Sequence, residues 1–297
     1  MRAAAWAGRW RGGRPAPSLR GPAAPPAVPT LSVNGSDVSY ADSGGGGEPV
    51  VLGHGYLMTS ALWDRQAAAL AGAGYRAVRP DWRGQGRSAV AAGGYDPWDL
   101  AADALALVDR LGIGRFHYVG HSMGGYVGYR LALRAPGRVA SLVQIGTGAE
   151  AEGGAALREY TALLWALRLV GYGPVLPRVL PILYGPAFLG DPARAAEVAE
   201  QERRVRSNRR AGVFRAGRGI FGRDDVAGEL GRITAPTLVV TGEHDRPHPP
   251  AQGRADAARI PGARFVELAG VGHTPPAEAP DETARLVLDW VRRHPIA

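Results

Sequence analysis

One serine lies between two glycines in the segment YVGHSMGG, residues 118–125, directly after a short run of β-branched and aromatic residues. A serine hydroxyl is a poor nucleophile until a general base removes its proton, so Ser122 needs a histidine that a carboxylate orients. Attack on a carbonyl carbon also needs backbone N–H groups that stabilise the oxyanion. A nucleophilic Ser122 therefore requires a base, an acid and two donors elsewhere in the chain.

Candidates for the acid and the base follow two later strands. The segment PTLVVTG, residues 236–242, leads to Asp245, and ARFVELAG, residues 263–270, leads to His273. The order serine, acid, histidine is one of the chain orders in which this catalytic group occurs. Because all three residues come just after the carboxyl ends of strands, we expect them on the same rim of a sheet.

The oxyanion donors are expected in two turns. A strand ending in PVVL leads into GHGY, residues 53–56, so the backbone N–H of Tyr56 can point inward. The N–H of Met123, directly after Ser122, is the second expected donor. His54 is then expected to be structural and to hold the turn.

The elements that position these residues alternate along the chain. Helical patterns cover 97–111, with Asp96 as N-cap, and also 123–135 and 281–293. Alternating strands and helices predict a mostly parallel sheet flanked by helices. The predicted strands are LSV (31–33), VSYAD (38–42), PVVLGHG (49–55), RAVRPD (76–81), FHYVG (116–120), VASLVQIG (139–146), PTLVVTG (236–242) and ARFVELAG (263–270).

The alternation stops in the middle of the chain. Residues 151–230 have a helix-like pattern with Pro-Gly breaks and are predicted to be a helical insertion above the carboxyl ends of the strands, where such sheets bind ligands. Residues 30–150 and 231–297 then form the core. Residues 1–29 are rich in Arg, Pro and Ala without hydrophobic periodicity, so we expect a disordered tail.

Composition narrows the function classes. The 297 residues include no cysteine, and the histidines lack metal-ligand spacing, so neither a disulfide nor a metal site is expected. The net charge of +8 comes from arginine alone, and the sequence has no basic patch interleaved with aromatic residues that would indicate nucleic-acid binding. No segment is predicted to span a membrane or act as a signal peptide. We expect a cytoplasmic monomer or homodimer whose partner is a small-molecule substrate.

Five motifs follow one another in the chain: HGY (54–56), DWRGQGRS (81–88), GHSMGG (120–125), PTLVVTGEHD (236–245) and GVGH (270–273). With these motifs in this order, the chain resembles the α/β-hydrolase fold superfamily over about residues 30–296. The resemblance implies an α/β fold with a mostly parallel eight-stranded sheet, a helical cap over residues 151–230 and no cofactor. It also implies a catalytic triad of Ser122, Asp245 and His273, with Tyr56 and Met123 as oxyanion donors.

The resemblance narrows the reaction without fixing it. A serine at the nucleophile position argues against haloalkane dehalogenases and soluble epoxide hydrolases, which have aspartate there. The sequence is similar to small carboxylesterases, enol-lactonases, carbon–carbon bond hydrolases and cofactor-free haloperoxidases. We expect hydrolysis of a carboxylic ester or lactone through an acyl-enzyme on Ser122. The alternatives are carbon–carbon hydrolysis, perhydrolysis, a cyclase or lyase step in biosynthesis, and ligand binding without catalysis.

Several residues keep competing interpretations. Glu243 is close to Asp245, and some members of the superfamily take their acid after the sixth strand, where Glu150 or Glu152 could serve. Many members have proline where this chain has Leu57, which leaves the shape of the oxyanion turn open. We expect His248 not to compete with His273. The charged run ERRVRSNRR, residues 202–210, is predicted to face solvent, with an anion-recruiting lid as the alternative.

Overall fold

The computed structural model describes residues 29–296, so the tail predicted for residues 1–29 lies outside the described residues except for its last position. The strands are β1 (Thr30–Val33), β2 (Ser36–Asp42), β3 (Pro49–Gly53), β4 (Arg76–Pro80), β5 (Phe116–His121), β6 (Val139–Ile145), β7 (Thr237–Gly242) and β8 (Arg264–Leu268). They form one eight-stranded sheet in the order β1-β2-β4-β3-β5-β6-β7-β8. The two pairs that include β2 are antiparallel and all other neighbours are parallel, which confirms the predicted architecture.

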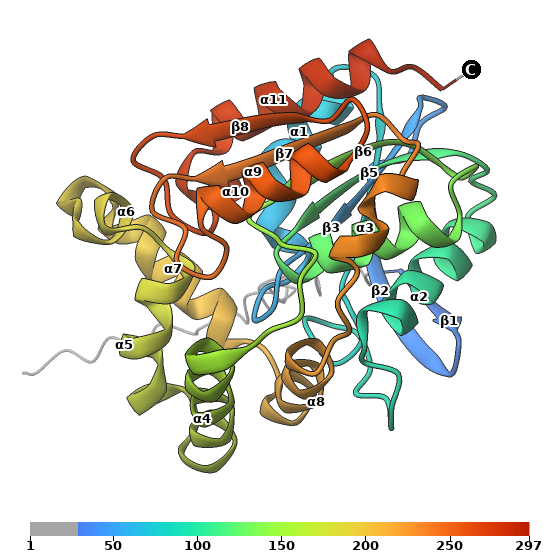
Figure 1. The fold of residues 1–297 in the computed structure, drawn as a ribbon. Coiled ribbons are helices and arrows are strands. Elements are labelled where there is room, and N and C mark those ends of the chain that lie inside the picture. The colour runs from blue at the N-terminus through green and yellow to red at the C-terminus, as the bar shows by residue number, and fades with distance from the viewer. Residues whose placement is uncertain (1–28, 297) are drawn as a thin grey trace, which may run out of the picture.

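Helices cover both faces of the sheet (Figure 1). They are α1 (Asp64–Gly72), α2 (Pro97–Arg110), α3 (Met123–Arg134), α9 (Pro250–Arg259), α10 (Pro275–Glu278) and α11 (Pro280–Arg293), with short 3-10 helices at Ser60–Trp63, Pro192–Arg194 and Ala227–Arg232. Val50 and Leu52 of β3 pack in the cluster that holds α1 and α11, whereas Val51 packs with α2 and α3. Because successive strand side chains point to opposite faces, each apolar run supplies both cores.

Helix α2 begins where the sequence predicts. The side chain of Asp96 accepts hydrogen bonds from the backbone N–H groups of Trp98 at 2.8 Å and Asp99 at 2.9 Å, which satisfies two donors that have no partner inside the helix. Pro97 occupies the first helical position, where its missing N–H costs nothing. The helix ends at Arg110, one residue before the predicted limit.

The segment between β6 and β7 consists of helices, which gather beside one end of the sheet (Figure 1). Side chains from α4, α5 and α8 line the same cavity as Ser122, so this is the end at which the parallel strands finish. Nowhere in residues 29–296 is a helix both long and apolar enough to cross a membrane. The inserted helices are α4 (Gly154–Val170), α5 (Tyr172–Leu183), α6 (Pro186–Gly190), α7 (Ala195–Arg206) and α8 (Arg210–Phe221).

The segment DWRGQGRS forms a turn after β4 that its own side chains brace. The carboxylate of Asp81 accepts from the backbone N–H of Arg87 at 3.0 Å, and the Ser88 hydroxyl donates to the Asp81 carbonyl at 2.6 Å. Arg83 forms a buried ion pair with Asp103 of α2 at 2.5 Å. These contacts brace the turn, so the roles of Asp81, Arg83 and Ser88 are structural.

Candidate active site

Ser122 occupies a strained position between β5 and α3. Its backbone has φ 51° and ψ −116°, a combination that a non-glycine residue adopts only where the surrounding structure imposes it. The strand and helix approach so closely that a Cβ on Gly120 would lie 2.4 Å from the carbonyl oxygen of Gly124. A Cβ on Gly124 would lie 2.1 Å from the carbonyl oxygen of Gly53. The two glycines therefore permit the sharp turn that presents the Ser122 hydroxyl.

The structure brings Ser122, His273 and Asp245 together. The Oγ of Ser122 lies 3.0 Å from Nε2 of His273, and Nδ1 of His273 lies 2.9 Å from Oδ1 of Asp245. Because the carboxylate can only accept, Nδ1 carries the proton and Nε2 is free to accept from the serine. The side chains of His273 and Asp245 are buried, which shields the contact between them from solvent. The arrangement can remove the proton of the Ser122 hydroxyl.

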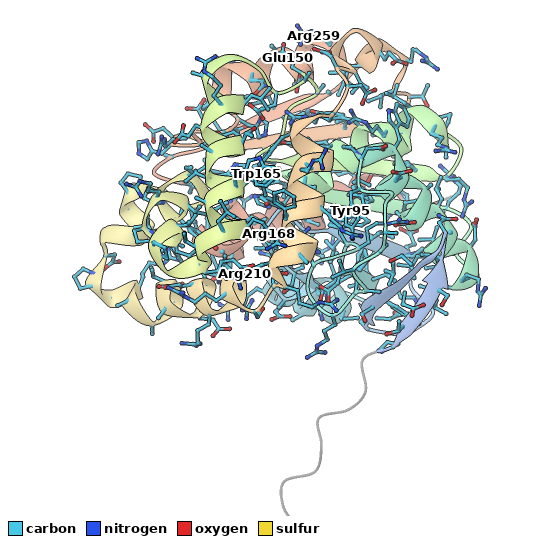
Figure 2. The ribbon with its side chains drawn as sticks, turned by 90° about the horizontal axis from the view of Figure 1, so that it is seen from below. Tyr95, Glu150, Trp165, Arg168, Arg210 and Arg259 are labelled. Carbon is cyan, nitrogen blue, oxygen red and sulfur yellow. The ribbon has the colours of Figure 1, made fainter. Side chains whose placement is uncertain are left out.

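The other candidate acids have different partners. Glu243 accepts from the backbone N–H of Gly270 at 2.8 Å. Glu150 lies 3.4 Å from Arg259 at the surface, where Figure 2 shows the two residues together. Glu152, which is part of the cavity wall, lies 3.3 Å from Arg223. Among the candidate acids only Asp245 hydrogen bonds to His273 within the described chain.

The turn expected to supply oxyanion donors has an unusual backbone. Within residues 29–296, neither the Tyr56 N–H nor the Met123 N–H donates a hydrogen bond, and Met123 begins α3, where such donors are left over. Leu57 has φ 66° and donates its N–H to Oε1 of buried Gln85 at 2.7 Å. A proline has no N–H and cannot adopt this φ, so Leu57 is a structural departure from the family pattern.

His54 holds this turn, as the sequence predicts. Its Nε2 accepts from the backbone N–H of Trp82 at 3.0 Å, and its Nδ1 contacts the carbonyl oxygen of Gly55 at 2.8 Å. Burial lowers the pKa of His54, so it remains neutral and keeps one nitrogen as an acceptor.

Ser122 and His273 line a cavity of about 710 Å³, counting its opening to solvent. Most of the wall is apolar and comes from the inserted helices, so the cavity suits a small organic molecule with limited polarity. Besides Ser122 and His273, the wall contains Tyr56, Leu57, Tyr126, Glu152, Tyr160, Leu163, Leu164, Leu167, Val175, Val179, Ile182, Leu183, Ile220, Phe221 and Pro247.

Known proteins are similar to this chain in sequence and in architecture. A family model described as alpha/beta hydrolase fold matches residues 48–168. A protein of Variovorax paradoxus (strain S110), assigned as the carbamate hydrolase RutD, is 34% identical over 239 residues, which cover 77% of this chain and 86% of that protein. The chain belongs to the alpha/beta hydrolase family.

Two solved structures match this hydrolase over nearly all of their length. A thermophilic esterase from Thermogutta terrifontis is 29% identical with a TM-score of 0.82, covering 90% of this chain and 98% of that one. The enol-lactonase from Burkholderia xenovorans LB400 is 29% identical with a TM-score of 0.83, covering 89% and 100%. The resemblance inferred from the five motifs is thus confirmed at the level of the family and its fold.

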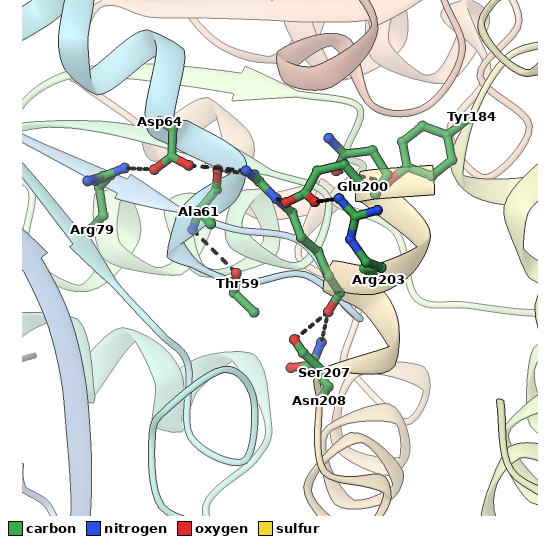
Figure 3. A network of polar contacts seen from close by, with 11 residues as sticks. Thr59, Ala61, Asp64, Arg79, Tyr184, Glu200, Arg203, Ser207 and Asn208 are labelled. Atoms are coloured by element: carbon green, nitrogen blue, oxygen red, sulfur yellow. Dashed lines mark hydrogen bonds and ion pairs between the residues drawn. The ribbon is translucent and has the colours of Figure 1, made fainter. Parts of the chain in front are cut away.

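The arginines of the charged run do not line the hydrolase cavity. Arg204 lies 2.7 Å from Glu200 and 3.3 Å from Asp64 of α1, and Arg206 lies 2.6 Å from Glu202 (Figure 3 shows the Glu200 and Asp64 contacts). These ion pairs are at least partly exposed and tie α7 to itself and to α1. The structure thus supports the interpretation of this run as a solvent-facing surface.

His248 packs beside His273 and Asp245 without contacting Ser122. Its Nδ1 lies 3.0 Å from Oε1 of Gln252, so its Nε2 accepts from the Tyr126 hydroxyl at 2.8 Å. Its backbone N–H donates to Oδ1 of Asp245 at 2.9 Å. Burial lowers the pKa of His248 to about 4, so the ring is neutral at physiological pH. Tyr126 lies one helical turn after Ser122, and this spacing is the one signal in the sequence that could have indicated it.

Sequence reasoning also missed Glu278, which belongs to the segment PPAEAP, residues 275–280, shortly after His273. Its carboxylate accepts from the backbone N–H groups of Gly272 at 2.8 Å, Thr274 at 2.8 Å and Gly185 at 2.9 Å. A buried carboxylate with three such donors fixes the loop that carries His273 and joins it to the inserted helices.

A second serine, histidine and acid are connected at the opposite end of the strands. His117 Nδ1 lies 2.8 Å from Ser141 Oγ, and His117 Nε2 lies 3.1 Å from Glu48 Oε2. Ser141 is 0% exposed, whereas Ser122 is 8% exposed and lines the cavity. A serine, a histidine and an acid joined by hydrogen bonds are therefore not enough to identify an active site, because the serine must also reach a cavity.

In residues 29–296, no three His, Asp or Glu side chains are grouped to hold a metal ion.

Proposed function

We propose that this hydrolase cleaves a carboxylic ester or lactone through an acyl-enzyme on Ser122. The observation that carries the proposal is the 3.0 Å contact between Ser122 Oγ and His273 Nε2 at the wall of a largely apolar cavity. A hydroxyl in this position meets both the base that activates it and the space that a substrate needs. The similarity to an esterase and to an enol-lactonase agrees with this reaction class.

The proposed reaction has two halves. His273 Nε2 takes the Ser122 proton as Oγ attacks the carbonyl carbon, and the N–H groups of Tyr56 and Met123 stabilise the oxyanion. The C–O bond to the alcohol breaks, and His273 returns the proton to the leaving oxygen. Water then loses a proton to His273 and attacks the acyl carbon, which releases the acid and restores Ser122. Asp245 holds the imidazole in the required tautomer and stabilises its charged form.

We assign substrate choice to residues 151–230, acting as a cap. Helices α4, α5 and α8 supply most of the apolar cavity wall, whereas Ser122 and His273 come from the core. The alternatives, carbon–carbon hydrolysis, perhydrolysis and a cyclase or lyase step, use the same three residues, and the substrate must distinguish them.

The test is turnover of p-nitrophenyl esters, lactones and β-diketones, together with labelling by a serine-directed phosphonate. Ser122→Ala is expected to lose labelling and to lower kcat by about 10³-fold or more. Ser141→Ala is the matched control, because it removes another serine that contacts a histidine. This variant is expected to keep both phosphonate labelling and ester turnover. Labelling that survives in Ser122→Ala would refute the proposal. Turnover of β-diketones without ester hydrolysis would assign the triad to carbon–carbon cleavage.

A further inference from the structure

The polar groups of the cavity are few and mostly acceptors. Apart from Ser122 and His273, its wall contains one carboxylate, Glu152, and three tyrosines. The hydroxyl of Tyr56 is already used, because it donates to the carbonyl oxygen of Val213 at 3.0 Å. The Tyr126 hydroxyl donates to His248 and therefore presents only oxygen lone pairs to the cavity.

Glu152 is held in the wall by a cation behind it. Oε2 of Glu152 lies 3.3 Å from Nη1 of Arg223, whose side chain is 2% exposed against 13% for Glu152. The guanidinium lies 4.0 Å from the centre of the Tyr126 ring, and Nη1 also donates to the Ile220 carbonyl at 3.1 Å. Arg223 thus lies outside the cavity lining, and Oε1 of Glu152 accepts no hydrogen bond from residues 29–296.

Tyr160 completes this polar corner. Its side chain lines the same cavity as Glu152, and burial and then the charge of Glu152 raise the pKa of Tyr160. The exposed Arg246 is the other cation near Tyr160, but it does not line the cavity and is directed to the Pro181 carbonyl. A substrate that reaches this corner therefore meets the carboxylate of Glu152, the lone pairs of Tyr126 and the phenol of Tyr160, but no cation in the cavity lining.

We propose that the cavity selects a substrate that carries a hydrogen-bond donor, a hydroxyl or an ammonium group, placed against Glu152, and that it excludes substrates with a carboxylate at that position. The role of this selection in turnover rests on the proposed ester or lactone hydrolysis. A donor gains a charge-assisted hydrogen bond from Glu152. A carboxylate would be desolvated beside a like charge, and the cavity lining contains no cation to offset that cost.

The overall charge of the protein favours the opposite preference. A net charge of +8 attracts anions over long distances, so a preference for cations or neutral donors must come from the cavity itself. A measured preference for the hydroxyl or ammonium substrate therefore could not be explained by the net charge of the protein.

The first test compares p-nitrophenyl alkanoates of about four to eight carbons that end in methyl, hydroxyl, ammonium or carboxylate. The wild type is expected to have a kcat/KM at least about tenfold higher for the hydroxyl or ammonium ester than for the carboxylate ester at one or more lengths. Glu152→Gln is expected to reduce this ratio to about threefold or less, and because the ratio compares substrates within one variant, a general change in activity cancels from it. Glu159→Gln, an equal charge change at an exposed position of α4, is the matched control and should keep the wild-type ratio.

A binding measurement separates this inference from the proposed reaction. Calorimetry on Ser122→Ala with octylamine, octanol and octanoate requires no turnover. The amine or the alcohol is expected to bind about tenfold more tightly than octanoate, and Glu152→Gln in the Ser122→Ala background should abolish the difference. Discrimination in binding without ester hydrolysis would leave the inference standing and refute only the reaction. A wild-type preference for carboxylates, or equal ratios with and without Glu152, would overturn the inference.

Discussion

Glu278 accepts hydrogen bonds from the backbone on both sides of His273, at Gly272 and at Thr274, each at 2.8 Å. The same carboxylate accepts from Gly185, between α5 and α6. The position of the imidazole and the position of the inserted helices therefore depend on one buried side chain. We infer that Glu278 is a positioning residue, which contacts the loop of His273 rather than the substrate.

Glu278→Gln is expected to lower kcat about 10-fold to 100-fold and to reduce the free energy of unfolding by about 1–3 kcal/mol. The reason is that the carboxamide nitrogen cannot accept, so one or two buried N–H groups lose their partner. Steady-state kinetics and urea unfolding measure the two effects. The control Glu282→Gln, at an exposed site of α11, should change stability by no more than about 0.5 kcal/mol. Unchanged kcat in Glu278→Gln would contradict the positioning role.

Gln85→Met should lower kcat about tenfold or more with little change in KM. Gln85 contacts both sides of the expected oxyanion site, since Oε1 accepts from Leu57 N–H at 2.7 Å and Nε2 lies 3.7 Å from Met123 Sδ. Without the acceptor, the Leu57 amide is buried without a partner and the adjacent Tyr56 N–H is free to turn away. Gln85→Glu keeps an acceptor oxygen and is expected to restore part of kcat.

The kinetic split distinguishes this role from general damage to the fold. Gln201→Met, the same substitution in α7, controls for the change in side-chain chemistry and should leave kcat unaltered. Equal losses in the Met and Glu variants at position 85, or a rise in KM alone, would argue against a role of Gln85 in holding the oxyanion turn.

The succession of strands and helices along the chain and the Ser122 turn were predictable because they follow from local patterns. Short apolar runs ending at glycines specify buried strands, and the small residues around Ser122 mark a close approach of strand and helix. The choice among the candidate acids does not follow from a local pattern. Asp245, Glu243 and Glu150 all follow strand ends, and only the fold determines which carboxylate reaches His273.

Other features of the site depend on contacts between distant segments. Glu152 faces the cavity because Arg223, 71 residues later, holds it there, and no periodicity in the sequence indicates that pair. Tyr126 and His248 are 122 residues apart and meet only across the fold. The left-handed backbone of Leu57 depends on a hydrogen bond to Gln85, 28 residues away, and no pattern in the sequence pairs the two.

Asp256→Asn is expected to gain stability relative to the wild type as the pH rises. Burial raises the pKa of Asp256 to about 6, so the folded state holds a proton that the unfolded chain releases near pH 4, and wild-type stability falls as this carboxyl ionises. Between pH 5 and pH 8 the wild type should lose about 1 kcal/mol more than the variant. Urea unfolding at both pH values measures this. Asp281→Asn, at a highly exposed site, should keep the wild-type slope, and parallel slopes for Asp256→Asn would refute the assignment.

His248 should act in the opposite direction, as a source of acid sensitivity. Its pKa of about 4 lies below the ordinary value near 6.5, so the unfolded chain binds a proton more readily than the folded chain. Stability from this group is fully present above pH 6.5 and is lost as the pH falls toward 4. On going from pH 7 to pH 5, the wild type is expected to lose about 2 kcal/mol more than His248→Gln.

The comparison of slopes isolates His248, because the other titrating groups are common to both proteins. His244→Gln, in an exposed turn four residues earlier, is the matched control and should retain the wild-type loss between pH 7 and pH 5. If His248→Gln loses as much stability as the wild type, the ring is not buried in its neutral form. Its hydrogen bond from Tyr126 would then have to be reassigned, because a protonated ring could not accept it.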